Sequence, residues 1–160
     1  MTRWLTLFFF LFSLSAHAIE PGDKRFSHTV YLQPHSKLRQ AAELGDAEAQ
    51  YDLAYLYYKA DSDPSIQGVP QSDQKAAYWY RKAAQQGHGR AQYNMAVLHL
   101  QGHGVERDPI EAYAWLLLAQ ANGHQESQAV IDELDAILNP RQVQSAEARS
   151  SELVLAGTTR

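Results

Sequence analysis

The chain has 160 residues and a formal net charge of −4, and 45% of its residues are hydrophobic. A net acidic chain lacks the basic footprint that binds nucleic acid or a generic anionic membrane surface, so we expect neither partner. It contains no cysteine, so disulfide bonds are excluded and the fold must be held by packing alone. The length suits a single domain with a moderate core.

The N-terminal segment has the pattern of a secretory signal peptide. Arg3 provides a positive charge, residues 4–14 form an apolar run, and Ala16 and Ala18 give a small-x-small cleavage pattern. A transmembrane helix needs about 20 apolar residues, so this run is short for a span, with an uncleaved anchor as the alternative. We expect cleavage after Ala18, a periplasmic location and no stable membrane insertion afterwards.

The rest of the chain divides into an arm, a helical domain and a tail. Residues 19–35 contain Pro21, Gly22 and Pro34 without a clear period, which predicts an extended arm. Residues 36–155 form the predicted repeat domain, and residues 156–160 a disordered tail. Apolar periodicity predicts helices over residues 36–44, 47–59, 72–86, 90–101, 109–122, 125–137 and 140–154.

An internal repeat organises these helices. Trp79 recurs as Trp115, and the alanines and the Gly-His pair around it recur at the same spacing of 36 residues. An upstream half-unit matches at a spacing of 42, and the six additional residues fall in a loop around residues 61–65. Ala76, Trp79 and Ala83 share one helix face, so we expect the indole to fill the gap where helices cross closely.

Residues at the helix ends support the same boundaries. Asp108 as N-cap, a proline at the next position and Glu111 predict a capping box, and Asn139 with Gln142 repeats that pattern. Three glycines follow apolar-periodic runs, where a left-handed residue ends a helix. They are Gly45, Gly87 and Gly123.

This pattern resembles the Sel1-like repeat, a relative of the tetratricopeptide repeat, over residues 38–137. The matching residues include Ala49, Leu53, Ala54, Gly68, Ala76, Trp79, Ala83 and Gly87 in one unit and Ala91, Ala96, Gly104, Asp108, Ala112, Trp115, Ala119 and Gly123 in the next. The resemblance implies an all-α solenoid of about seven helices in a right-handed superhelix, binding proteins or peptides. The sequence departs from the pattern at His99, where the family has Tyr, and between the units at Lys75/Glu111, Arg81/Leu117 and Lys82/Leu118.

A stripe of tyrosines is the main candidate binding surface. By resemblance it faces the concave groove, and tyrosine offers a large contact area with a polar tip. The alternative is that the first helix or the 19–35 arm covers the stripe. The candidate residues are Tyr51, Asp52, Tyr55, Tyr58, Tyr93, Asn94, Val97 and Gln101.

A second candidate is the nearly all-apolar helix over residues 113–119. Its Leu117 and Leu118 predict either an exposed docking patch, through which the chain could oligomerise, or contacts with the terminal helix 140–154.

Catalytic and metal sites are not expected. His99 and His103 have an i, i+4 spacing, but glycines flank His103 and no His-Glu-x-x-His motif is present to supply a base. Ser72 and Lys75 match a Ser-x-x-Lys string without its companion motifs, and Ser72 aligns with a predicted N-cap. We therefore expect no cofactor, no metal and no enzyme activity.

The sequence thus predicts an exported adaptor that binds a protein or peptide in the bacterial cell envelope. The alternatives are a hydrolase acting on β-lactams or cell-wall polymers, and a structural assembly component.

Overall fold

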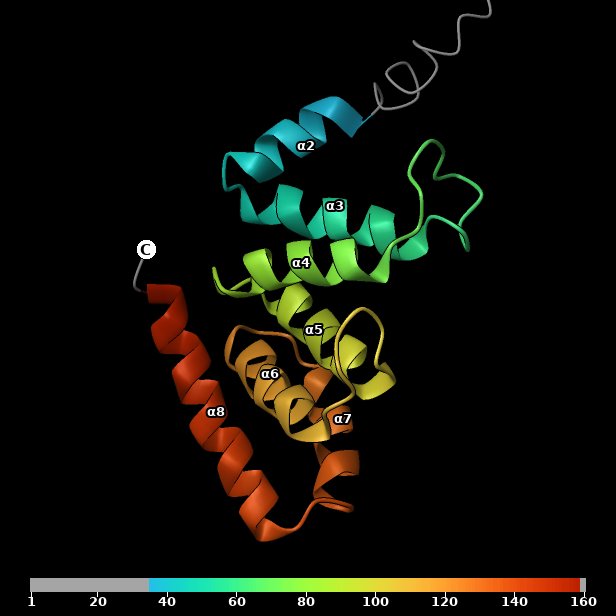
Figure 1. Ribbon diagram of the computed structural model, residues 1–160. Helices are drawn as coiled ribbons and strands as arrows, with labels where there is room; N and C mark the ends of the chain where they lie inside the picture. The colour runs from blue at the N-terminus through green and yellow to red at the C-terminus, as the bar shows by residue number, and fades with distance from the viewer. Residues whose placement is uncertain (1–34, 159–160) are drawn as a thin grey trace, which may run out of the picture.

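Residues 35–158 are described by a computed structural model, in which they form seven α-helices and no strand (Figure 1). The predicted signal peptide and residues 19–34 of the arm lie outside this part of the chain. Within it, no helix is both long and apolar enough to cross a membrane. The helices are α2 (Ser36–Glu43), α3 (Ala47–Lys59), α4 (Asp73–Ala84), α5 (Gly89–Gln101), α6 (Pro109–Ala121), α7 (Ser127–Asp135) and α8 (Pro140–Thr158).

The helices stack in chain order, and the last one runs back along the stack. Each helix from α2 to α6 packs against the next one in the sequence. Helix α8 instead lies along α6, and its C-terminal end approaches the end of α4 (Figure 1). The predicted all-α stack of paired helices is therefore confirmed, with α8 as an outer cover on the second pair.

The predicted helix ends agree with the observed ends to within two residues for the first six helices. Asp108 caps α6 as expected, because its side chain accepts hydrogen bonds from the backbone amides of Ile110 and Glu111 at 2.8 and 3.1 Å. The side chain of Glu111, however, binds α8 and leaves the capping box one-sided. Asn139 and Gln142 form the complete box, since each side chain accepts a hydrogen bond from the backbone amide of the other.

Helix α8 ends later than predicted. It continues through Ala156 and Gly157 to Thr158, where the sequence predicted an end at residue 154 and a disordered tail from residue 156. Gly157 packs against the carbonyl oxygen of Gln85, and a Cβ atom at this position would lie 2.4 Å from that oxygen. The close approach of this glycine seats the last turn of α8 on the end of α4.

The core is built from alanines at the helix crossings and from a few large side chains. Ala112, Trp115 and Ala119 are all at most 1% exposed, which confirms the predicted alanine and tryptophan face in the second repeat. Trp79, the equivalent of Trp115, is only half-buried. The same residue type thus meets different surroundings in the two repeats.

The loops between the paired helices close in the same way despite their different lengths. The backbone amide of Ser72 donates to the carbonyl of Tyr57 at 3.0 Å, and the amide of Asp108 donates to the carbonyl of His99 at 3.0 Å. The His99 ring also lies 3.0 Å from the carbonyl oxygen of Glu106, and burial lowers the pKa of His99. His99 therefore holds the shorter second loop in place through its contact with Glu106.

Candidate functional site

The predicted tyrosine stripe lies along one side of α3 and is joined to α5 by side chains. Tyr55 is 39% exposed, while Tyr51 and Tyr58 are half-buried against the core. The Tyr58 hydroxyl donates to Oε1 of Gln101 on α5 at 3.1 Å. The structure therefore brings members of the predicted set on α3 and α5 into contact at Tyr58 and Gln101, and we call the whole set the tyrosine face. It comprises Tyr51, Asp52, Tyr55, Tyr58, Tyr93, Asn94, Val97 and Gln101.

Two of these tyrosines are held by repeat-equivalent histidines. Tyr51 stacks on His88 with ring centroids 4.7 Å apart, and Tyr93 stacks on His124 at 4.4 Å. Nδ1 of His88 also accepts a hydrogen bond from the amide of Ala91, so this histidine is the N-cap of α5. The recurrence of the Gly-His pair is thus structural, as predicted, and each stack limits the rotation of a tyrosine ring.

A charged group borders the tyrosine face at the N-terminal ends of α3 and α5. Glu48 accepts from Nε2 of His88 at 3.0 Å and forms an ion pair with Arg90. The His88 hydrogen bond and the nearby Arg90 hold the pKa of Glu48 below its usual value. The Arg90 guanidinium in turn lies 4.5 Å from the centroid of the Tyr51 ring, which is a cation–π contact.

Sequence reasoning missed this charged group, although a signal for it was present. Glu48 and Arg90 are 42 residues apart and so occupy equivalent positions in successive units. Opposite charges at equivalent positions of neighbouring helices predict an ion pair between those helices. Tyr80 was also missed: it is buried 5.6 Å from Tyr51, centroid to centroid, and forms part of the floor of the tyrosine face.

The polar members of the tyrosine face are placed to contact a ligand. Asp52 is exposed, and its pKa is raised by partial burial and by the negative charge of Glu48. Gln101 is exposed, while Asn94 and Val97 are half-buried on α5. A surface with rigid aromatic rings, amide groups and a carboxylate can bind an extended polypeptide, particularly one with a basic side chain opposite Asp52.

The predicted docking patch on α6 is covered. Leu118 is 9% exposed and lines a cavity together with Leu153 of α8, and Leu117 is half-buried against the core. Arg149 of α8 donates to Glu111 of α6 at 2.7 Å and fixes the cover in place. The apolar character of this helix therefore reflects contacts within the chain, and the burial of Leu118 favours the second predicted alternative, contact with the terminal helix.

The residues that suggested metal or catalytic chemistry have structural partners. Residues 35–158 contain no group of three or more His, Asp or Glu side chains able to hold a metal ion. The helix ends at Gly102, which has a left-handed conformation, between His99 and His103. The Ser72 hydroxyl accepts from the backbone amide of Lys75 at 3.3 Å and caps α4, as the sequence predicted.

The architecture defines an α-solenoid built from stacked helix pairs. Residues 47–88, which hold α3 and α4, and residues 89–124, which hold α5 and α6, each match the Sel1 repeat family. The chain therefore contains two Sel1 repeats, in agreement with the predicted resemblance.

Solved structures with the same fold support this assignment. The chain is similar to a protective antigen of uropathogenic Escherichia coli that displays an SLR fold, with 30% identity and a TM-score of 0.67, covering 80% of this chain and 28% of that one. It is also similar to a Sel1 repeat protein from Oxalobacter formigenes, with 29% identity and a TM-score of 0.56, covering 65% of this chain and 44% of that one.

Among curated proteins, the chain is 30% identical over 95 residues to chitin synthase regulatory factor 3 of Schizosaccharomyces pombe. It is 31% identical over 87 residues to an F-box protein of Arabidopsis thaliana. These matches cover 59% and 54% of this chain, which spans only 10% and 20% of the two relatives. The Sel1 repeat fold implies a role in protein–protein interaction.

Proposed function

We propose that this Sel1-repeat protein is an adaptor that binds a segment of a partner protein across the tyrosine face of α3 and α5. The observation that carries the proposal is the pair of tyrosine–histidine stacks, which hold Tyr51 and Tyr93 in fixed positions on adjacent repeats. A preformed aromatic surface loses little side-chain entropy on binding, so more of the contact energy appears as affinity.

The partner segment we propose is extended and carries a basic side chain. Tyr55 offers an exposed ring, and Asp52 lies one turn before it with its carboxylate free to pair with a cation. The Arg90 charge is already paired with Glu48, so it adds little attraction for an anion. Asn94 and Gln101 supply amide groups that can bond to a peptide backbone.

We further propose that the protein acts in the bacterial cell envelope after export. The support is the signal-like pattern of residues 1–18, with its positive charge, apolar run and small residues at the cleavage point. A fusion of residues 1–18 to a reporter enzyme that is active only outside the cytoplasm tests the export step. An inactive reporter would contradict it.

The binding proposal is tested by the double variant Tyr55→Ala, Tyr93→Ala. Partners recovered by affinity purification with the unmodified chain are purified, and their dissociation constants are measured by calorimetry. Aromatic anchors typically contribute about 2 kcal/mol each, so we expect the loss of two to weaken binding about a thousandfold.

The matched control is Ile137→Ala, which removes an exposed apolar side chain between α7 and α8 that lies outside the tyrosine face. Circular dichroism confirms that each variant is folded. Equal affinities for the unmodified chain and the double variant would contradict the proposal.

A further inference from the structure

Two cavities occupy equivalent places in the two repeats, each beside a tryptophan of the outer helix. The cavity beside Trp79 has a volume of about 470 Å³, and the cavity beside Trp115 about 440 Å³. Their linings correspond position by position at the repeat spacings. In this order, Ala42, Gly45, Gln50, Trp79 and Lys82 of the first cavity match Ala84, Gly87, Gln92, Trp115 and Leu118 of the second.

The cavity beside Trp115 is covered by the chain itself. Leu153, Val154 and Gly157 of α8 line it, and Leu153 is 8% exposed. Trp115 is consequently almost completely buried, at 1% exposure. The second repeat thus shows what kind of element closes one side of this cavity: an α-helix that presents an apolar side chain beside the tryptophan.

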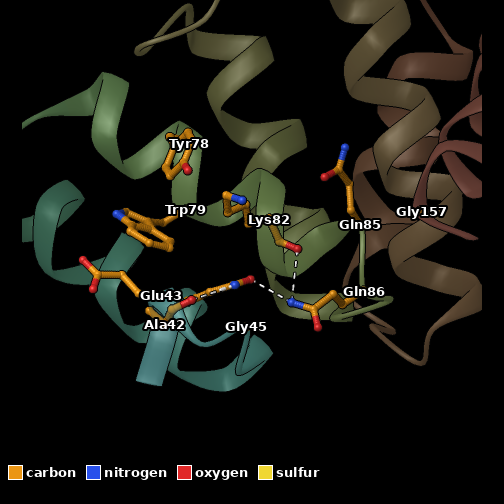
Figure 2. Close-up of a pocket in the computed structure, with 10 residues that line it drawn as sticks. Ala42, Glu43, Gly45, Tyr78, Trp79, Lys82, Gln85, Gln86 and Gly157 are labelled. Atoms are coloured by element: carbon orange, nitrogen blue, oxygen red, sulfur yellow. Dashed lines mark hydrogen bonds between the residues drawn. The ribbon is translucent and has the colours of Figure 1, made fainter. Parts of the chain in front are cut away.

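Among the residues described, α8 reaches the cavity beside Trp79 only at Gly157, which has no side chain to place beside the tryptophan. Figure 2 shows Trp79, Tyr78 and Lys82 of α4 around the cavity, with Ala42 and Glu43 of α2 along its border. Tyr78 is 53% exposed, and Leu44, next to the lining residue Gly45, is 82% exposed. Large exposed apolar side chains around a cavity are typical of a surface that binds another protein.

The charge of the open cavity differs from that of the covered one. Lys82 stands where the covered cavity has Leu118, and its ammonium group lies 5.3 Å from the centroid of the Tyr78 ring. Glu43 lines the same cavity, but within residues 35–158 neither it nor any other carboxylate forms an ion pair with Lys82. An element that fits the open cavity therefore gains from a carboxylate next to its apolar residue.

We propose that the cavity beside Trp79 binds an amphipathic α-helix of a partner protein, which presents an apolar side chain to Trp79 and an acidic side chain to Lys82. The packing of α8 along the equivalent cavity indicates the helical form, and Lys82 indicates the acidic residue. This site goes beyond the proposed adaptor function, because it uses α2 and the outer side of α4 instead of the tyrosine face. Each site can fail in its own test without affecting the other.

The probe for this site is a synthetic peptide with the sequence of residues 140–158, acetylated and amidated at its ends. It reproduces the helix that covers the equivalent cavity, and it contains Glu152 directly before Leu153. Nuclear magnetic resonance of the labelled protein follows the indole N–H signal of Trp79, which is assigned with Trp79→Phe. We expect this signal to shift in a saturable manner as the peptide is added.

Charge variants test the acidic contact. Lys82→Glu in the protein should weaken peptide binding about tenfold, and Glu152→Gln in the peptide should weaken binding to the unmodified protein. Arg141→Glu, at the far end of α8 in the protein, makes the same change of charge and should have no effect.

Three results would overturn the proposal. The first is a Trp79 signal that does not move at millimolar peptide concentration. The second is a shift confined to the Trp115 signal, which would mean that the peptide replaces α8. The third is a Trp79 shift that follows protein concentration without peptide, which would identify a second copy of the chain as the occupant.

Discussion

The two Sel1 repeats share one backbone plan but differ in what covers their outer helices. On α6, Trp115 and Leu118 are buried under α8, whereas on α4 the equivalent Trp79 and Lys82 are half-buried beside an open cavity. Residues that differ between the repeats therefore include those that contact α8. Residues that the repeats share make contacts that occur in both.

The largest expected difference between the repeats is at the two tryptophans. Trp115→Ala should lower the free energy of unfolding by about 3–5 kcal/mol, because it empties a fully buried site under α8. Trp79→Ala should cost only about 1–2 kcal/mol, because less apolar surface is lost from a half-buried side chain. Urea denaturation followed by circular dichroism measures both values. Equal losses of unfolding free energy in the two variants would mean that the cavity beside Trp79 is covered in solution.

A smaller effect is expected at the ion pair that fixes α8 on the second repeat. Arg149 donates to both carboxylate oxygens of Glu111, at 2.7 and 3.2 Å. The Arg149 side chain is 43% exposed, so solvent screening limits the coupling energy to about 0.5–1 kcal/mol. A double-mutant cycle with Glu111→Gln and Arg149→Gln measures it. Lys75, the equivalent of Glu111 in the first repeat, provides the control in the variant Lys75→Gln, which should show no coupling to Arg149.

The smallest expected effect is on the pH dependence of the free energy of unfolding. It arises from His99, which occupies the position of Tyr57 in the first repeat. Burial lowers the pKa of His99 in the folded chain, so the unfolded chain binds a proton more readily. The stability that the buried, neutral His99 ring contributes is complete above the unfolded pKa of about 6.5 and is lost as the pH falls below it. Urea denaturation at about pH 7.5 and 5.5 should therefore show a smaller loss of stability for His99→Asn than for the unmodified chain.

The control for the histidine prediction is His103→Asn, which changes an exposed residue four positions later. It should retain the pH dependence of the unmodified chain. If His99→Asn also retains the pH dependence of the unmodified chain, then protonation of His99 does not contribute to the pH dependence of stability.

Much of the fold could be predicted from the sequence because the two repeats give independent indications of the same helix boundaries. Helix ends inside the repeats were indicated by local chemistry, such as the Asp108 cap, and again by an equivalent residue in the neighbouring unit, such as Ser72. The positions of Tyr51 and Tyr93 on one surface followed from the same alignment. Helix periodicity and capping are local properties, so sequence spacing is sufficient to find them.

The contacts between elements distant in the sequence could not be predicted in the same way. The path of α8 depends on how Leu153 and Gly157 meet α6 and α4, and nothing in the local pattern of α8 fixes that direction. The sequence also left open whether Leu118 is exposed, because an apolar helix face is equally suited to a partner or to the chain's own last helix. These questions depend on tertiary packing, which overrides local propensity.

The return of α8 across the stack has a consequence for how the protein unfolds. In most repeat arrays each unit touches only its neighbours, so the ends can unravel while the middle stays folded. Here the last turn of α8 rests on Gln85 of the first repeat, so separating the second repeat from its neighbours also breaks that contact. The molecule should consequently denature as one cooperative unit, and it should lose this cooperativity when α8 is removed.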